Sequence, residues 1–295
     1  MKILVAGANG QVATELRLQG ESSPHQVITL GRDDLDIRFE QQVQNAFAEH
    51  QPDIVINAAA YTAVDKAEEE TEQAYAINRD GAKNLAAACE MQAIPFLHIS
   101  TDYVFDGSKQ QAYSESDAVS PLGVYGESKW AGEQAVRENC PQHIIVRTSW
   151  VFSQHGGNFV KTIARVSAER DELRVVNDQL GSPTSAAGIA NMLLQLCDRY
   201  EQQQTLPWGT YHFAGAPFTS WHGFAEQIVD LAYQKGLIDH SVKVHAIPSS
   251  EYPTPAKRPA NSQLQCEKLK KALGIEADDW QMQLEQVING LAEQN

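Results

Sequence analysis

The sequence predicts an α/β fold with a parallel, doubly wound sheet, followed by a smaller C-terminal lobe. Short apolar runs rich in β-branched residues recur along the first half of the chain, and stretches with helical spacing separate them. These runs are apolar almost throughout, as expected for strands that helices cover on both faces. The expected strands are 2–6, 26–30, 53–57, 94–100 and 143–149, and the clearest helices between them are 40–49 and 74–91.

The pattern divides the chain into two parts. Residues 1–149 are expected to form a Rossmann-type core, and residues 150–295 mainly a smaller lobe. After Trp150 the regular alternation is lost, and glycine and proline cluster in loops. Segments around 185–214 are expected to return to the core, because a helical run there is followed by a strand-like one.

Composition and charge narrow the class of protein. The chain has 295 residues, enough to bury a large core, and a formal net charge of −15, which disfavours nucleic acid as a partner. Its first apolar stretch is too short for a signal peptide or membrane span, so a cytoplasmic protein without a membrane partner is expected. The cysteines lack disulfide or zinc spacing: Cys89, Cys140, Cys197 and Cys266.

Two glycines directly follow the first expected strand. Gly7 and Gly10 stand between that strand and a helix-like stretch. Glycines at such a junction let the backbone approach a pyrophosphate, which amides and the positive end of the helix then hold. The spacing is Gly-x-x-Gly-x-x-Ala rather than Gly-x-Gly-x-x-Gly, so an ordinary tight turn remains an alternative to a dinucleotide-binding loop.

The end of the second strand indicates which dinucleotide would bind. NAD-binding chains commonly place an acid there, whereas an arginine accommodates the 2′-phosphate of NADP. Arg32 follows Gly31 at this point, which favours NADPH and leaves use of NADH open; a surface arginine in a turn is the alternative. Asp36 and Ile37 in the next loop suit contacts with the adenine edge.

The strongest chemical signal is the pair Tyr125 and Lys129. Residues four apart lie on one face of a helix, and Ser120 with Pro121 is expected to begin this helix. Reduction of a carbonyl needs a hydride and a proton. A free tyrosine has a pKa of about 10, and a neighbouring ammonium stabilises its phenolate. Tyr125 is therefore the expected proton donor and Lys129 the residue that tunes it.

Thr101 is the expected third member of this site. It lies at the carboxyl end of the fourth strand, the edge where such sheets bind ligands, and its hydroxyl can hold a substrate carbonyl. Tyr-x-x-x-Lys is frequent by chance, so a surface pair on an amphipathic helix is the alternative. The order of motifs favours catalysis: a glycine loop after the first strand, small residues after the third, Ser-Thr-Asp after the fourth, then the tyrosine and lysine.

With these motifs in this order, the chain resembles the extended short-chain dehydrogenase/reductase family over nearly its full length. The more specific segments are NAAAYTAVDKAE (57–68), STDYVF (100–105), VYGESK (124–129), RTSWV (147–151), NF (158–159), NDQLGSPT (177–184) and YPTPAKRP (252–259). The last three lie in the smaller lobe and its approaches, where related enzymes diverge with substrate. The resemblance thus implies an NADPH-dependent oxidoreductase whose substrate is a dTDP-linked 4-keto-6-deoxy sugar.

The resemblance also implies individual roles. Contacts to the cofactor would come from Gly10, Gln11 and Val12 at the pyrophosphate, Asp36 and Ile37 at the adenine, Ala60, Tyr61 and Thr62 at its middle, and Lys129 at the nicotinamide ribose. Thr101, Asp102 and Trp150 would face the sugar nucleotide, although a lone tryptophan after a strand is more often core. Arg258 suits the substrate pyrophosphate, with a surface salt bridge as the alternative.

Two positions depart from the family pattern. Ala13 replaces a glycine that several relatives carry in the phosphate loop. Some members hold Mg²⁺ between subunits through glutamates, but here Glu15 stands with Ala187 and Gly290 at the corresponding positions. One carboxylate is too few oxygen ligands for this cation. No metal is predicted, and a monomer or weak homodimer is expected.

Two other functions remain open. The chain can be a reductase or epimerase acting on another nucleotide sugar, or a non-catalytic subunit that binds the cofactor for regulation. The presence of Thr101, Tyr125 and Lys129 together counts against the regulatory subunit, because a site without activity has no chemical reason to keep all three.

Overall fold

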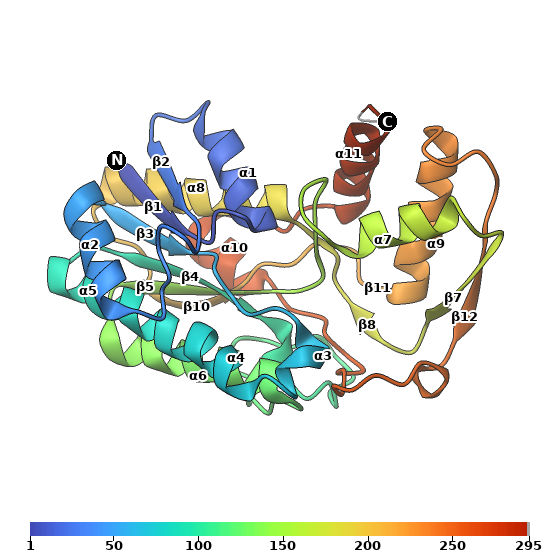
Figure 1. Cartoon of the computed structure of the whole chain (residues 1–295), viewed down its shortest axis with the longest axis horizontal. Coiled ribbons are helices and arrows are strands. Elements are labelled where there is room, and N and C mark those ends of the chain that lie inside the picture. The colour runs from blue at the N-terminus through green and yellow to red at the C-terminus, as the bar shows by residue number, and fades with distance from the viewer. Residues whose placement is uncertain (294–295) are drawn as a thin grey trace.

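A six-stranded parallel sheet forms the centre of the larger part of the molecule (Figure 1). The computed structural model describes residues 1–293. The strand order is β10-β5-β4-β3-β1-β2, and all neighbouring strands run parallel. This architecture confirms the predicted α/β fold. The strands are β1 (Lys2–Ala6), β2 (Gln26–Leu30), β3 (Ile54–Asn57), β4 (Phe96–Thr101), β5 (His143–Thr148) and β10 (Gly209–His212).

Helices cover both faces of this sheet because successive strand residues point to opposite sides. Ile3 and Val5 of β1 belong to one buried cluster, whereas Leu4 and Ala6 belong to another. Both sets are buried, which explains why the strands are apolar throughout. One face carries α1 (Gln11–Gly20), α8 (Ala186–Gln203) and α10 (Glu267–Leu273); the other carries α2 (Glu40–His50), α5 (Ala82–Gln92) and α6 (Val124–Asn139).

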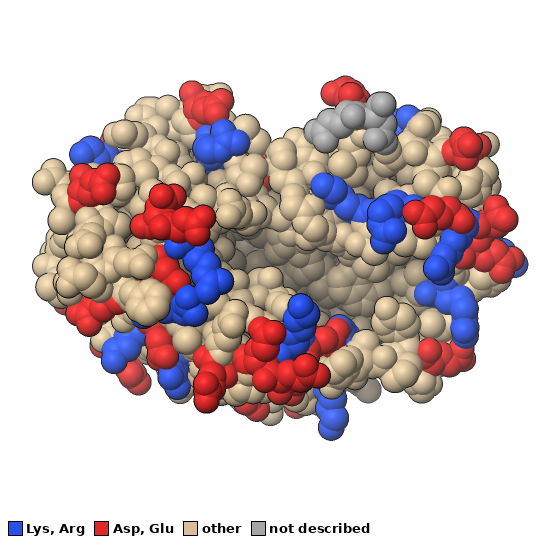
Figure 2. Space-filling view, viewed as in Figure 1, with Lys and Arg blue, Asp and Glu red and all other residues tan. Residues whose placement is uncertain are grey.

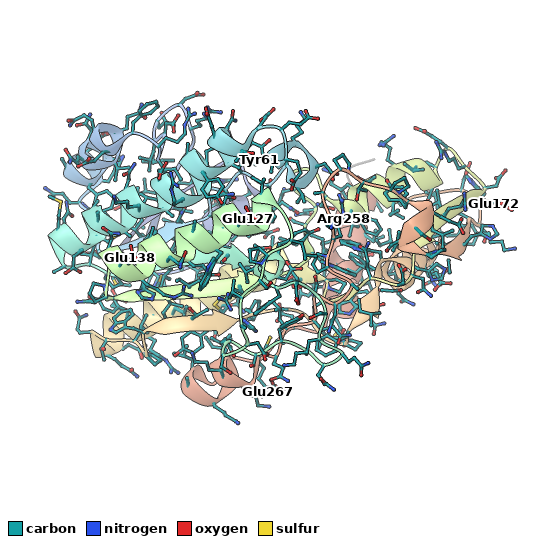
Figure 3. All side chains as sticks on the ribbon, turned by 90° about the horizontal axis from the view of Figure 1, so that it is seen from below. Tyr61, Glu127, Glu138, Glu172, Arg258 and Glu267 are labelled. Atoms are coloured by element: carbon teal, nitrogen blue, oxygen red, sulfur yellow. The ribbon has the colours of Figure 1, made fainter. Side chains whose placement is uncertain are left out.

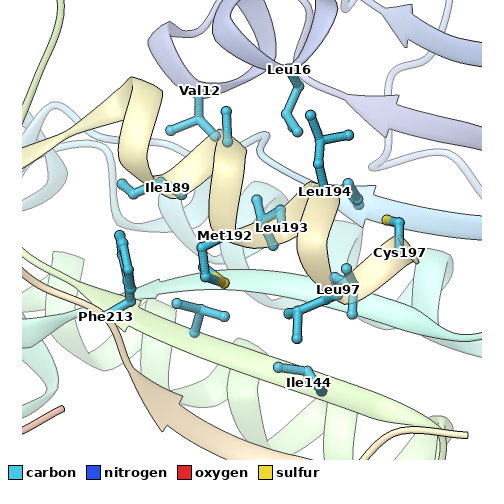
Figure 4. Packing of buried hydrophobic residues seen from close by; sticks show 14 of the residues in the cluster. Val12, Leu16, Leu97, Ile144, Ile189, Met192, Leu193, Leu194, Cys197 and Phe213 are labelled. Carbon is cyan, nitrogen blue, oxygen red and sulfur yellow. The ribbon is translucent and has the colours of Figure 1, made fainter. Parts of the chain in front are cut away.

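The chain returns to the sheet after residue 185. Helix α8 packs against α1, and β10 forms the edge of the sheet beside β5. Figure 4 shows the apolar face of α8, where Met192 and Leu193 meet Leu97 of β4 and Ile144 of β5. This cluster fixes α1, and with it the loop that precedes α1, against the sheet.

The smaller lobe lies beside the carboxyl edge of the sheet (Figure 1). Its core is aromatic and includes Phe152, Phe224 and Trp280. Two of its strands, β7 (Glu172–Val176) and β12 (Lys243–Ile247), form a parallel pair that sequence analysis missed. The lobe also contains α7 (Phe159–Ser167), α9 (Trp221–Gln234), α11 (Trp280–Ala292), η3 (Ser249–Glu251) and the short strands β6 (Val151–Phe152), β8 (Leu180–Gly181), β9 (Thr184–Ser185) and β11 (Thr219–Ser220).

Helix α6 begins later than predicted. Its N-cap is Gly123, and Ser120 lies in an extended segment where its backbone N–H donates to the carbonyl of Val104 at 2.9 Å. The start at Ser120 was therefore wrong, because this long-range hydrogen bond keeps the segment out of the helix. The remaining helical elements between β3 and α6 are α3 (Val64–Ala67), α4 (Thr71–Tyr75), the π-helical turn η1 (Ala76–Gly81) and the 3₁₀ turn η2 (Asp102–Val104).

No helix within residues 1–293 is long and apolar enough to span a bilayer.

Candidate active site

A cleft of about 520 Å³ opens at the carboxyl edge of the sheet (Figure 2). The segments that follow β1, β3, β4 and β5 line it, together with the first turns of α6 and residues 156–158 of the smaller lobe. A second hollow of about 250 Å³ continues from it toward the end of β2, and both include residues 58–60. Strand β2 lies on one side of β1, and β3 lies on the other, so the order of the strands reverses at β1. Open α/β sheets bind ligands at the carboxyl edge where this reversal occurs.

The glycine loop requires glycine at its first position. Gly7 has a φ of +102°, and a Cβ there would lie 2.8 Å from the backbone nitrogen of Ala59. Gly10 is the N-cap of α1 and provides no side chain to cap the first N–H groups of that helix. Those groups have no partner within a helix and suit an anion. A dinucleotide pyrophosphate therefore fits this cradle.

A loop from the smaller lobe packs against the glycine loop. Asn158 caps α7 by accepting from the backbone N–H of Lys161, and its side-chain amide donates to Oε1 of Gln11 at 2.9 Å. A Cβ added at Gly156 would lie 3.2 Å from the side chain of Gln11, so the two loops are in close contact. The predicted pyrophosphate site is thus bordered by both parts of the molecule.

Two arginines meet at the end of β2. Nε of Arg38 donates to Oδ1 of Asp36 at 2.9 Å, and Nε of Arg32 lies 3.5 Å from Oδ2 of the same carboxylate. The hydrogen bond from Arg38 is the main reason that the pKa of Asp36 is lowered, and burial opposes it. Arg32, Arg38, Asp36 and Ile37 all line the second hollow. Two guanidinium groups beside one carboxylate leave a net positive charge, which suits the 2′-phosphate of NADP.

Arg38 was not predicted from the sequence. Its side chain is about a quarter exposed, whereas that of Arg32 is 61% exposed, so Arg38 is the more rigidly held of the two. The signal was present in the sequence, because Arg38 directly follows the pair Asp36 and Ile37 that was assigned to the adenine. In the structure, Asp36 is bonded to this arginine in addition to lining the hollow.

Thr101, Tyr125 and Lys129 all line the large cleft. The tyrosine and lysine come from the first turns of α6, and the threonine ends β4. Burial raises the pKa of Tyr125 to about 12, and a hydrogen bond with the Thr101 hydroxyl opposes the rise. Burial lowers the pKa of Lys129 to about 8, while the charge of Glu133 opposes that change. Nζ of Lys129 donates to the carbonyl of Ile99 at 2.6 Å.

A buried ion cluster lies directly behind Lys129. Glu133, one turn further along α6, accepts a hydrogen bond from Ser100 at 2.6 Å and two from Arg147 at 2.8 and 2.7 Å. Arg137 donates to the same carboxylate at 2.6 Å. This cluster was not predicted from the sequence, because Arg147 comes from β5 and only the position of Glu133, four residues after Lys129, can be read along the chain.

Trp150 stacks on Trp221 with ring centroids 3.6 Å apart, and it lines the large cleft. Its φ of +47° lies in the left-handed region, which a tryptophan rarely adopts. Gly181 makes room for the indole, since a Cβ there would lie 2.4 Å from the ring. The tryptophan therefore belongs both to the lobe core and to the wall of the site.

Arg258 lies where the smaller lobe meets the sheet domain (Figure 3). It forms a two-pronged ion pair with Asp65, with distances of 3.0 and 2.8 Å, and it is not among the residues lining the cleft. Tyr61 also points elsewhere, since its hydroxyl donates to Glu70 at 2.9 Å, while Ala60 and Thr62 line the cleft.

Within the described residues, no group of three or more histidine, cysteine, aspartate or glutamate side chains is arranged to hold a metal ion. Glu15 instead accepts a hydrogen bond from the Ser153 hydroxyl at 2.9 Å.

The fold and the site together define the class of protein. A glycine loop after β1 and the group of Thr101, Tyr125 and Lys129 at the carboxyl edge are the marks of an extended short-chain dehydrogenase/reductase. The chain belongs to the family described as RmlD substrate binding domain, whose model matches residues 1–293. This membership confirms the resemblance inferred from the sequence.

Several relatives of the chain are named for the same activity. It is 43% identical to the dTDP-4-dehydrorhamnose reductase of Sinorhizobium fredii over 95% of this chain and 94% of the relative. It is 38% identical to the enzyme of the same name from Escherichia coli K12, over 99% and 98% of the two chains.

Solved structures agree with these relatives. A dTDP-4-dehydrorhamnose reductase from Clostridium acetobutylicum has a TM-score of 0.91 and 40% identity, covering 99% of each chain. One from Bacillus anthracis, solved in complex with NADP, has a TM-score of 0.90 and 36% identity over 97% and 98%. A UDP-glucose 4-epimerase from Thermus thermophilus shares the fold alone, at 17% identity.

Proposed function

We propose that this chain reduces the 4-keto group of dTDP-4-dehydro-β-L-rhamnose with NADPH to give dTDP-L-rhamnose. The observation that carries the proposal is the meeting of Thr101, Tyr125 and Lys129 in one cleft beside the glycine loop. Reductases with this name match nearly the whole chain, which supports the choice of substrate. The complex of one such reductase with NADP supports the choice of cofactor.

The cofactor site extends along the two joined hollows. Gly7, Gly10, Gln11 and Val12 would hold the pyrophosphate, Asp36 and Ile37 the adenine side, and Ala60 and Thr62 the middle of the molecule. The side chain of Tyr61, which was assigned to the same part of the cofactor, points to Glu70 instead. Arg32 would contact the 2′-phosphate, and Arg38 joins it in this proposal because it lines the same hollow. Lys129 would hold the nicotinamide ribose. When bound, NADPH supplies a hydride.

Tyr125 supplies the proton in this mechanism. Its phenolic O–H passes a proton to the oxygen of the former carbonyl, and the resulting phenolate is stabilised by the Lys129 ammonium and by the Thr101 hydroxyl. Burial raises the pKa of Tyr125, so the phenol keeps its proton until negative charge develops on the substrate oxygen. These three residues share one cleft wall, which allows them to act together.

The sugar nucleotide would lie between the sheet domain and the smaller lobe. Thr101, Asp102 and Trp150 line that part of the cleft. Arg258 would bind the substrate pyrophosphate after leaving Asp65, its present partner. We further propose that the enzyme works as a monomer or weak homodimer, and that NADH can replace NADPH at lower efficiency.

The test is a Tyr125→Phe variant assayed by NADPH oxidation with freshly made 4-keto sugar. Turnover should fall by about 10²- to 10⁴-fold, the usual contribution of a general acid, with NADPH affinity little changed. Tyr233→Phe is the matched control, because Tyr233 is 51% exposed. Near-normal turnover by Tyr125→Phe would exclude the assigned role.

Alternative substrates separate this function from its rivals. UDP- and GDP-linked 4-keto sugars should be reduced much more slowly than the dTDP-linked one. An epimerase would convert its sugar without net consumption of NADPH, and a regulatory subunit would show no turnover. The same assay with NADH tests the assignment of the arginines, because a clear preference for NADH would contradict it.

A further inference from the structure

Asp102 is a buried carboxyl group in the wall of the cleft. It begins η2, directly after Thr101, and is 2% exposed. No lysine or arginine among the described residues forms an ion pair with it. Burial raises its pKa to about 6, against the hydrogen bonds that favour the ionised form. This carboxyl can therefore gain or lose a proton close to neutral pH.

The oxygens of Asp102 have few partners. Oδ1 accepts a hydrogen bond from the Thr101 hydroxyl at 2.9 Å. Oδ2 is buried and has no partner of good geometry within residues 1–293, although the Ser262 hydroxyl lies beside the carboxyl. A protonated carboxyl would be a donor here as well as an acceptor. Asp102 can then donate a hydrogen bond to Thr101 instead of accepting one from it.

Thr101 stands between two groups that compete for one proton. Its hydroxyl donates to Asp102, and it lines the same cleft as the Tyr125 phenol, whose pKa a hydrogen bond from Thr101 lowers. A hydroxyl has one O–H and accepts through its lone pairs, and here it already accepts from the backbone N–H of Tyr103 at 3.2 Å. It cannot donate to Asp102 and Tyr125 at the same time.

We propose that Asp102 is a positioning residue whose protonation sets the direction of a hydrogen-bond chain from Asp102 through Thr101 to Tyr125. When the carboxyl is protonated, it donates to Thr101, and Thr101 donates to the phenol. When it is ionised, Thr101 turns its proton to Asp102, and the phenol loses a donor. The inference rests on the proposed reductase function, because Tyr125 must act as the acid.

Other charged and titratable groups surround the hydrogen-bond chain from Asp102 to Tyr125. Tyr103 comes from the same turn, Tyr125 and Lys129 from α6, and Arg258 with Asp65 lies beyond Tyr103. Burial raises the pKa of both tyrosines far above neutrality. Lys129 has a pKa of about 8, so its titration gives a separate limb at higher pH. Asp102 is the group in this set whose pKa is about 6.

The proposal fixes the sign of the pH dependence. A phenol that receives a hydrogen bond is a stronger acid, because its phenolate is stabilised. The reduction should therefore be fastest below the pKa of Asp102 and should slow as pH rises through it. The loss of one hydrogen bond to a developing charge corresponds to a fall in kcat of about tenfold or somewhat more.

Asp102→Asn is the main variant, because asparagine has the same shape and does not titrate. Its kcat should show no limb near pH 6, in contrast to the wild type. Thr101→Ser keeps the hydroxyl and should keep the limb, whereas Thr101→Val should lose it. The double variant with Asp102→Asn and Thr101→Val should have the same pH profile near pH 6 as Asp102→Asn alone, because the limb is already absent from the single variant.

A second measurement does not depend on turnover. Difference infrared spectroscopy of the free protein should show a protonated carboxyl band that disappears as pH rises through about 6 and is absent from Asp102→Asn. A limb that persists in Asp102→Asn would overturn the proposal, as would a variant in which only KM for the sugar changes. If the wild type does not reduce the sugar, the proposed function fails, and the infrared titration still decides whether Asp102 gains a proton.

Discussion

Replacement of Glu133 by glutamine tests how the catalytic face of α6 is held in place. The glutamate is fully buried and pairs with Arg147, which is 1% exposed. Glutamine keeps the shape but removes the charge, so Arg147 would remain buried with a partner that no longer compensates it. Breaking a buried pair in this way costs about 3–5 kcal/mol. With about 0.6 kcal/mol/K of unfolding entropy for a chain of this length, Tm should fall by about 5–8 °C.

The assay is thermal unfolding followed by circular dichroism. Glu21→Gln is the matched control, because Glu21 is 66% exposed and pairs with Arg17 at 3.2 Å on the helix surface. A surface pair of this kind contributes less than about 1 kcal/mol, so the Tm of the control should change by no more than about 1–2 °C. Equal losses for the two variants would refute the reasoning.

The difference in Tm between the wild type and Glu133→Gln should depend on pH in one direction. Burial alone would raise the pKa of Glu133, but the hydrogen bonds and charge of Arg147 hold it below its usual value. The folded pKa is thus lower than the unfolded one. The stabilisation is present above the unfolded value of about 4.5 and is lost as pH falls through the folded pKa. The gap in Tm between wild type and Glu133→Gln should therefore narrow in acid.

Two further substitutions test the cofactor site. Arg38→Ala should raise KM for NADPH by about tenfold or more and leave KM for NADH nearly unchanged, because the variant loses only a contact with the 2′-phosphate, which NADH lacks. Equal effects on both cofactors would contradict this assignment. Arg165→Ala, at an exposed position, is the control. Gly7→Ala should weaken NADPH binding by at least about tenfold in a fluorescence titration, since its Cβ would meet Ala59 in a left-handed conformation. Gly236→Ala has a similar φ of +71° with nothing within 4 Å, so it should leave NADPH binding unchanged; equal weakening in both would point to backbone strain alone.

The sequence predicts the sheet well because its signal is local. Strands β1 and β2 have the predicted bounds, since each is a short apolar run bordered by turns. The smaller lobe could not be derived in this way. Its parallel pair of β7 and β12 joins segments that are far apart in the chain, and no local pattern records which distant strand is the partner.

The same limit applies to the site. The spacing of Tyr125 and Lys129 is visible along a helix, and the structure places both in the cleft. The ion pair of Glu133 with Arg147 joins α6 to β5, and only the fold reveals it. Arg38 is an intermediate case, because its neighbour Asp36 was recognised but their pairing was not.

The polar face of α6 is best explained by chemistry rather than by packing. Lys129 and Glu133 are both buried, and their positions lie one turn apart, where apolar side chains would normally cover the sheet. Replacement of a buried ion pair by apolar groups is often neutral or stabilising, so stability alone does not account for these residues. The proposed role of Lys129 beside the phenol supplies a reason for the first charge. Because burial lowers the pKa of Lys129 to about 8, a negative charge one turn away helps to keep it protonated, which supplies a reason for Glu133.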